Sequence, residues 1–162
     1  MKTKSLLAAA LILAVSAPVV LTAASADETA IRELTSTFVA AWNNHDAAAM
    51  AATWAEDGDL INPAGIVAKG RAAVQELLAK EHFTVMKATT FEITNLDLRM
   101  MTREIALGDW SIVITGMADP DGKTMPPREM HVFQVYEKHD GKWLTAAGRP
   151  YAFAPMGPPP KG

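Results

Sequence analysis

The spacing of hydrophobic positions changes once along the chain. In the first half, Ile31, Leu34, Phe38 and Trp42 recur at three- and four-residue intervals and predict an amphipathic helix over about residues 28–44. From Thr84 onward apolar residues alternate with polar ones, which is the period of half-buried strands. Helices followed by strands predict an α+β domain rather than alternating βαβ units.

A second helix is expected after a short break at Asn43–His45. Asp46 has the side chain of a good N-cap, and the alanine-rich stretch behind it favours helix. Met50 and Trp54 would share one face of this helix.

Turn residues then separate a short strand from a third helix. Residues 56–59 are predicted as an acidic turn, the strand begins at Leu60, and residues 62–65 turn the chain again. The third helix is expected over about residues 70–81.

About four long antiparallel strands follow. Turn sequences at residues 119–122 and 139–141 predict hairpins between them. The last strand is expected from Lys142 to Phe153.

The N-terminus resembles a secretory signal peptide. Lys2 and Lys4 precede an uncharged, mostly apolar run over residues 6–21, and residues 24–26 form a small-residue cleavage site. We predict a cleaved signal over residues 1–26 and a periplasmic or secreted protein. An uncleaved anchor is the alternative, although the run is short for a membrane span.

The remaining chain is long enough for one domain with its own core. We expect this domain over residues 27–153 and a disordered, proline- and glycine-rich tail over 154–162. The 15 basic and 18 acidic residues give a net charge of −3, so no nucleic-acid partner is expected. The absence of cysteine excludes disulfides, thiolate nucleophiles and a lipoprotein anchor.

Five short motifs in this order resemble the nuclear-transport-factor-2-like superfamily, which includes SnoaL-like and ketosteroid-isomerase-like proteins, and in particular its SgcJ/EcaC-type branch. They are AWNNHD (41–46), WAEDGD (54–59), INPAG (61–65), Gly70-Arg71 and DGKW (140–143). The resemblance implies three N-terminal helices packed in the concave face of a strongly curved antiparallel sheet. This cone would enclose a central cavity, and a homodimer is expected.

Ketosteroid isomerases use a carboxylate base, a tyrosine and a protonated acid. By resemblance, the tyrosine position is Phe38, the base position is Asn62, and the acid lies near Phe133, with His131 as its neighbour on the same face. Phenylalanine donates no hydrogen bond and asparagine takes no proton at neutral pH. Isomerase chemistry by that route is therefore not expected.

A pocket remains the main expectation. Asn62 would either serve as a polar anchor in it or bond its own backbone in the turn. The predicted lining residues are Phe38, Trp42, Trp54, Asn62, Trp110 and Phe133.

Three functions stay open, and whether the protein is an enzyme is undecided. The first is binding of a small lipophilic molecule. The second is an isomerase, cyclase or lyase in which His131 is the general base and Asn62 the polar anchor. The third is a dimeric association module in which methionine-rich surface pairs two copies through Met100, Met101, Met117, Met125 and Met130.

The other polar candidates are expected to be structural. Asp57 and Asp59 lack the further ligands of a calcium loop, and no metal or cofactor is expected. The remaining histidines, His45, His82 and His139, are predicted to cap a helix or face solvent. Arg71 and Arg149 would form salt bridges or bind a carboxylate ligand.

Overall fold

The computed structural model describes residues 25–119 and 121–153, which form three helices and one six-stranded sheet. The helices are α1 (Ala26–Asn43), α2 (Ala47–Ala52) and α3 (Arg71–Phe83). The strands are β1 (Trp54–Ile61), β2 (Val67–Lys69), β3 (Thr90–Met100), β4 (Ile105–Thr115), β5 (Arg128–His139) and β6 (Lys142–Tyr151). The predicted α+β class, with three helices before the long strands, is confirmed.

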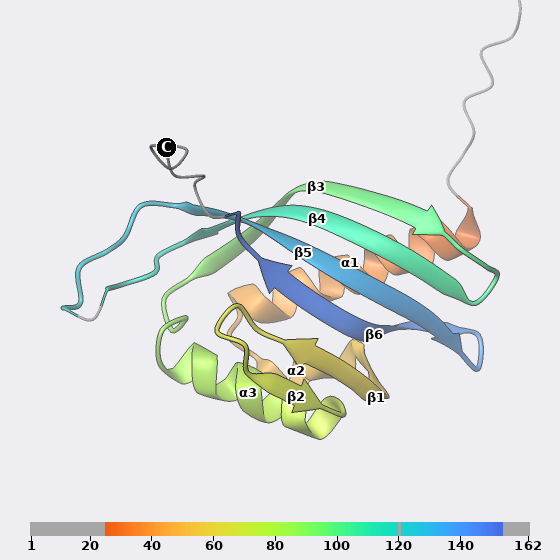
Figure 1. Cartoon of the computed structure of the whole chain (residues 1–162), viewed down its shortest axis with the longest axis horizontal. Helices are drawn as coiled ribbons and strands as arrows, with labels where there is room; N and C mark the ends of the chain where they lie inside the picture. The colour runs from red at the N-terminus through yellow and green to blue at the C-terminus, as the bar shows by residue number, and fades with distance from the viewer. Residues whose placement is uncertain (1–24, 120, 154–162) are drawn as a thin grey trace, which may run out of the picture.

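The strands lie in the order β2-β1-β6-β5-β4-β3, and every neighbouring pair is antiparallel except β1 with β6. Figure 1 shows the long strands curving over α1, with α3 beside β1 and β2. The pairing register shifts between β3 and β4 after Ile93 of β3, and between β5 and β6 at Ala146 of β6, and such bulges increase the bend of a strand. The sheet therefore closes partly around the helices, as the expected cone requires.

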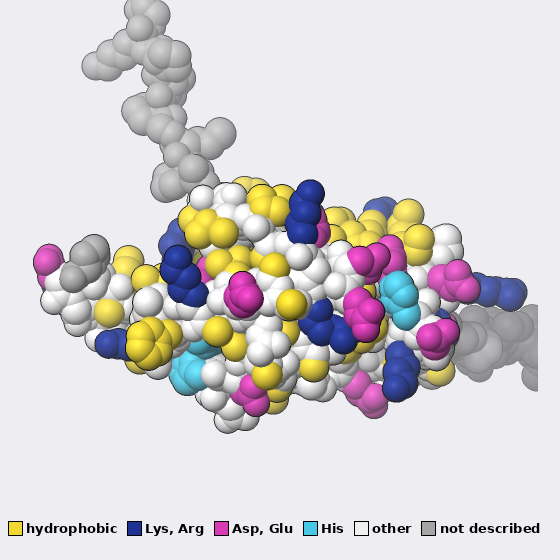
Figure 2. All heavy atoms as spheres, turned by 90° about the horizontal axis from the view of Figure 1, so that it is seen from below, with side chains coloured by type: hydrophobic (Ala, Val, Ile, Leu, Met, Phe, Trp, Pro, Cys, Tyr) yellow, Lys and Arg dark blue, Asp and Glu magenta, His cyan; other side chains and the backbone are white. Residues whose placement is uncertain are grey.

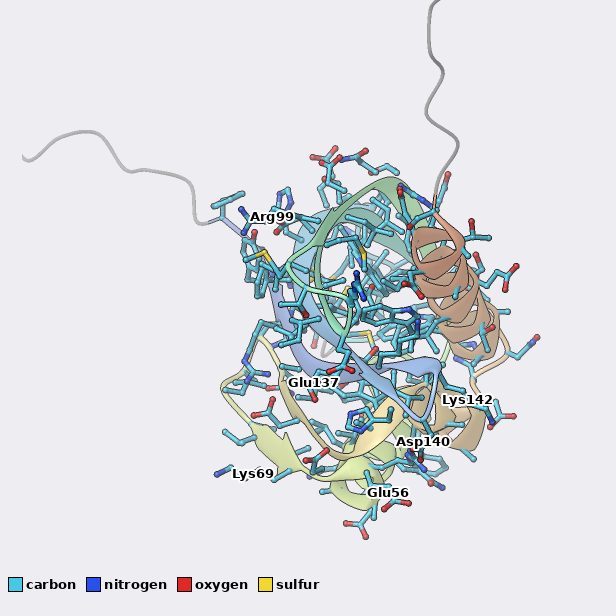
Figure 3. All side chains as sticks on the ribbon, turned by 90° about the vertical axis from the view of Figure 1, so that its right-hand side faces the viewer. Glu56, Lys69, Arg99, Glu137, Asp140 and Lys142 are labelled. Carbon is cyan, nitrogen blue, oxygen red and sulfur yellow. The ribbon has the colours of Figure 1, made fainter. Side chains whose placement is uncertain are left out.

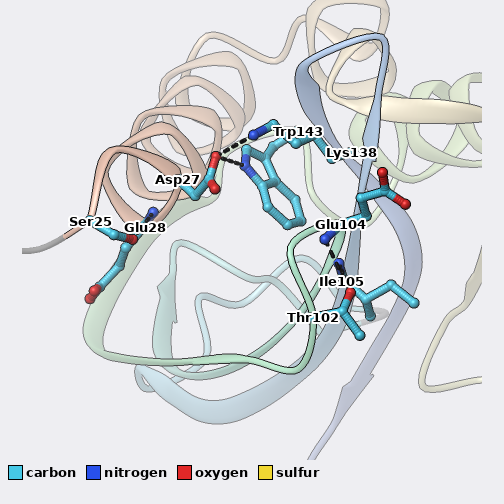
Figure 4. A network of polar contacts seen from close by, with 8 residues as sticks. All are labelled: Ser25, Asp27, Glu28, Thr102, Glu104, Ile105, Lys138 and Trp143. Atoms are coloured by element: carbon cyan, nitrogen blue, oxygen red, sulfur yellow. Dashed lines mark hydrogen bonds and ion pairs between the residues drawn. The ribbon is translucent and has the colours of Figure 1, made fainter.

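Both ends of α1 are bonded to the sheet. At its start, the Asp27 carboxylate accepts hydrogen bonds from Lys138 Nζ at 2.6 Å and from Trp143 Nε1 at 2.9 Å (Figure 4). At its end, the Asn43 side chain donates to the Phe91 carbonyl at 3.1 Å and accepts from the Phe91 N–H at 2.7 Å. These bonds hold the helix across the concave face.

The acidic segment 56–59 is not a turn, and Trp54 does not belong to the second helix. Both lie in β1, which begins at Trp54 and pairs with β2 and β6. A Cβ atom at Gly58 would lie 2.8 Å from the Thr145 carbonyl oxygen, so glycine is needed here for close backbone approach. Partners that are distant in sequence thus override the local turn signal, and the short strand β2 was not predicted.

The polar side chains are spread over the outside of the molecule. The face seen in Figure 2 carries basic and acidic side chains intermixed with scattered apolar ones. Figure 3 shows the space between helices and sheet filled with side chains, with Arg99, Lys69 and Glu56 near the outline of the view. Glu137, Asp140 and Lys142 lie near the β5–β6 hairpin in the same view.

Several predictions concern segments outside the described residues. Apart from residues 25 and 26, the predicted signal peptide is among them, as are Pro120 of the first hairpin turn and the tail 154–162. The second predicted hairpin turn is present at Asp140 and Gly141, which both have positive φ, 48° and 79°. Within the described part of the chain, no helix has the length and apolar character needed to cross a membrane.

Candidate functional site

A cavity of about 80 Å³ lies between the helices and the concave face of the sheet. Its wall is mostly aromatic and aliphatic, because the inward positions of α1, β1, β4 and β5 converge on it. Three polar side chains also line it, namely Asn62, Glu81 and Gln134. The main apolar lining residues are Phe38, Trp42, Trp54, Leu60, Phe91, Trp110, Met130 and Val132.

The aromatic wall is a packed cluster. Phe38 and Trp42 lie one helical turn apart on α1, so their rings meet with centroids 6.1 Å apart. The Phe38 ring also contacts Phe91 at 6.1 Å and Trp110 at 6.0 Å, both in edge-to-face geometry. Trp42 Nε1 donates to Thr89 Oγ1 at 3.3 Å. These contacts fix the shape of the wall, and the Thr89 hydroxyl satisfies the buried N–H group of Trp42.

Asn62 links the turn after β1 to α3. Its Oδ1 accepts hydrogen bonds from the backbone N–H groups of Ala64 at 3.1 Å and Ile66 at 2.8 Å. Those two donors fix the orientation of the amide, so Nδ2 is the atom that donates to Glu81 Oε1 at 2.7 Å. Asn62 therefore combines the turn role and the cavity role that the sequence left as alternatives.

Glu81 is the only ionisable side chain among the described residues that line the cavity. Burial raises the pKa of its carboxyl above the usual 4.5, because the charged form loses hydration, and the hydrogen bond from Asn62 offsets part of this. Sequence reasoning missed Glu81. A signal was present, since Glu81 lies three and four residues after the inward-facing Leu78 and Leu77.

Five of the six predicted pocket residues lie around the cavity: Phe38, Trp42, Trp54, Asn62 and Trp110. The sixth, Phe133, does not, and neither does the predicted base His131. On β5 the inward positions are occupied by Val132 and Gln134, so His131 and Phe133 face outward, where the His131 ring stacks on Tyr151 at 5.4 Å. Their assignment to the cavity was wrong, because a shift of one residue moves a strand side chain to the other face.

His82 was predicted to be exposed, but it is 6% exposed. Its Nδ1 lies 2.8 Å from Nδ1 of His45, and its ring centroid is 4.4 Å from that of Trp42. No group in the described part of the chain hydrogen-bonds its buried Nε2. Burial, with a smaller contribution from His45, lowers the pKa of His82 to about 4. The pair lies behind the aromatic wall rather than in the cavity.

The two arginines have structural partners. Arg149 Nη2 contacts both carboxylate oxygens of Asp59, at 2.8 and 3.0 Å, which agrees with the predicted salt bridge. Arg71 Nε donates instead to the Trp54 carbonyl at 2.7 Å. Residues 25–119 and 121–153 contain no group of three or more His, Cys, Asp or Glu side chains placed to hold a metal ion.

The curved sheet, the enclosed helices and the cavity define the nuclear-transport-factor-2-like class of protein. The SnoaL-like domain family matches residues 35–146, and the chain belongs to that family. No curated protein matches the sequence.

Solved structures share the fold at low sequence identity. An uncharacterised protein with a cystatin-like fold from Caulobacter vibrioides has a TM-score of 0.72 and 22% identity, covering 78% of this chain and 89% of its own. An NTF2-like protein with a cystatin-like fold from Novosphingobium aromaticivorans has a TM-score of 0.69 and 20% identity, covering 80% of this chain and 84% of its own. A ketosteroid isomerase-like protein from Erwinia carotovora atroseptica has a TM-score of 0.63 and 20% identity, covering 78% of this chain and 96% of its own. These likenesses concern the fold alone.

Proposed function

We propose that the protein binds a small, largely apolar molecule in the cavity and contacts one polar group of that molecule through the Asn62–Glu81 pair. The composition of the cavity wall carries this proposal. Aromatic and aliphatic side chains form nearly all of it, and the few polar groups are placed to orient a ligand. The usual isomerase route is not part of the proposal. Phe38 cannot donate the hydrogen bond that this route needs, and Asn62 cannot take the proton.

The cavity volume limits the ligand. About 80 Å³ is small beside the roughly 300–1,000 Å³ of most ligand pockets. A ligand the size of one aromatic ring therefore requires lining side chains to move. Met86 and Met130 are suited to this, since both line the cavity and methionine side chains repack easily.

The expected affinity is modest. Burying about 150 Å² of apolar surface contributes about 4 kcal/mol, which corresponds to a Kd near 1 mM. A hydroxyl group that donates to Glu81 Oε2 should strengthen binding by about 1 kcal/mol. Titrations should therefore extend to millimolar ligand.

The test is calorimetric titration of the purified protein with toluene and with p-cresol, which adds one hydroxyl. We expect both to bind and p-cresol to bind more tightly. Val132→Phe fills the cavity and should abolish binding, whereas Val67→Phe adds the same bulk at an exposed position of β2 outside the cavity and should preserve it. No binding of either compound by the wild type, or equal binding by a folded Val132→Phe variant, would contradict the proposal.

We further propose a periplasmic or secreted location and a homodimer formed through the outer face of the sheet. The signal-like N-terminus supports the location. Half-buried apolar side chains on that face support pairing, among them Leu107, Val113, Phe133 and Val135. Met130 does not contribute to such a surface, because it is 4% exposed and lines the cavity. Sedimentation velocity measures the association, and a monomer at high concentration would contradict it.

A further inference from the structure

We propose that Glu81 is a catalytic base that removes a proton from carbon in the bound molecule and returns it as an acid, which makes the cavity a proton-transfer site. This inference rests on the proposed function, since the substrate must first occupy the apolar cavity. It places the base on α3, whereas the sequence suggested His131 as the base with Asn62 as a polar anchor.

The hydrogen-bond geometry aims the carboxyl group. Asn62 Nδ2 holds Glu81 Oε1 at 2.7 Å, while two backbone N–H groups hold the other end of the Asn62 amide. One carboxylate oxygen is thereby restrained, and the described residues provide no hydrogen bond to Oε2. A base held by a fixed second residue, with one oxygen free, is the arrangement that proton abstraction requires.

The surroundings of Glu81 favour its role as a base. The apolar cavity wall raises the pKa of its carboxyl, which makes the carboxylate a stronger base. Glu81 is also partly exposed, so it can exchange its proton with water between turnovers. No second ionisable group among the described residues lines the cavity, and the neighbouring His82 contacts His45 and Trp42 instead.

The step is balanced without a co-reactant. The carboxylate takes a proton from a carbon atom beside a carbonyl, and the C–H electron pair becomes part of an enolate. The carboxylic acid then returns the proton to another carbon of the enolate, which gives an isomer. In a substrate with a leaving group, the electron pair expels that group instead and the proton passes to water.

The compound 5-nitrobenzisoxazole probes a base in an apolar pocket without knowledge of the natural substrate. It is larger than one aromatic ring, so its entry requires the same movement of Met86 and Met130 that a ligand needs. Its C–H proton moves to the base, the C–H electron pair completes a carbon–nitrogen triple bond, and the N–O bond breaks. The product is a coloured phenolate, so the rate is read directly from absorbance. A correctly placed carboxylate accelerates this step about 100-fold or more over a protein that lacks it.

The decisive variant is Glu81→Gln, which keeps the Oε1 acceptor for Asn62 but cannot take a proton. We expect its turnover of the probe to fall at least about 100-fold, to the buffer rate. Glu76→Gln, on an exposed position of the same helix, is the matched control and should keep the wild-type rate. The wild-type rate should also rise with pH through an inflection above 4.5, which a purely structural Glu81 would not produce.

Toluene titration separates the two proposals, because toluene makes no hydrogen bond to Glu81. If wild type and Glu81→Gln bind toluene equally and only the wild type turns over the probe, both proposals stand. If toluene binds but turnover is absent or unchanged in Glu81→Gln, the catalytic role is overturned and the binding function survives. If toluene does not bind the wild type, the binding proposal fails first and the catalytic one with it.

Discussion

The buried His82 imidazole should make the protein lose stability as the pH falls below neutrality. His82 is neutral in the folded state, where its Nδ1 shares one hydrogen bond with Nδ1 of His45. A second proton would place a charge beside the aromatic wall and break that bond. The unfolded chain has no such restriction and takes the proton at the ordinary pKa of 6.5.

The size of this stability loss follows from the difference between the pKa of His82 in the folded state and its pKa in the unfolded state. The folded pKa of about 4 lies below the unfolded value of 6.5, so the unfolded state binds more protons between these pH values. The contribution of His82 is therefore complete above about pH 6.5 and is lost as the pH falls towards 4. At about 1.4 kcal/mol per pH unit, the loss amounts to about 3 kcal/mol. Glu81 acts in the opposite direction, because its raised pKa favours the folded state at low pH.

The assay is urea unfolding, followed by tryptophan fluorescence at several pH values between 4.5 and 7.5. In His82→Leu the titrating group is replaced by an apolar side chain, while Glu81 and the other carboxylates remain. The difference between wild type and variant therefore isolates His82. We expect the free energy of unfolding of the wild type to fall by about 2 kcal/mol more than that of the variant over this range. His139→Gln, at the exposed β5–β6 hairpin, should behave like the wild type. A difference below about 0.5 kcal/mol would refute this account of His82.

Two further substitutions test the packing around the cavity. Asn43→Ala removes both hydrogen bonds to the Phe91 backbone, and we expect the free energy of unfolding to drop by about 1–3 kcal/mol in urea titrations; an unchanged midpoint would show that these bonds do not hold α1. Gly148→Ala would place a Cβ atom 2.5 Å from a ring carbon of Trp54, so we expect a loss of about 1–3 kcal/mol in thermal unfolding. A stability equal to that of the wild type would mean that the Trp54 ring moves without cost.

Much of the fold was predictable because the relevant signals are local. Phe38 and Trp42 face inward because helical spacing puts them on one side of α1, whatever the rest of the chain does. Asp46 caps α2 by accepting a hydrogen bond from the Ala49 N–H, as its residue type predicts. Asn62 lies in the turn that its proline neighbour predicts. Local spacing therefore placed Phe38 and Trp42 in the cavity wall, but it missed Phe91, which also lines the cavity.

The errors occurred where the outcome depends on strands that are distant in sequence. Residues 56–59 look like a turn by composition, but they pair with β2 and β6 and extend as a strand. The alternation in β5 gives two possible faces, and only its pairing with β4 and β6 decides that Val132 points inward and His131 outward.

The burial of Glu81 and His82 also depends on segments that are distant in sequence. Glu81 and His82 are successive residues of α3, yet one reaches the cavity and the other contacts His45 and Trp42. The sequence by itself determined that helices precede long strands, and it placed Phe38 and Trp42 on one face of α1, because these features follow from intervals of a few residues. Only the tertiary structure decided which ionisable groups lose their water, since desolvation depends on what the rest of the chain packs against them.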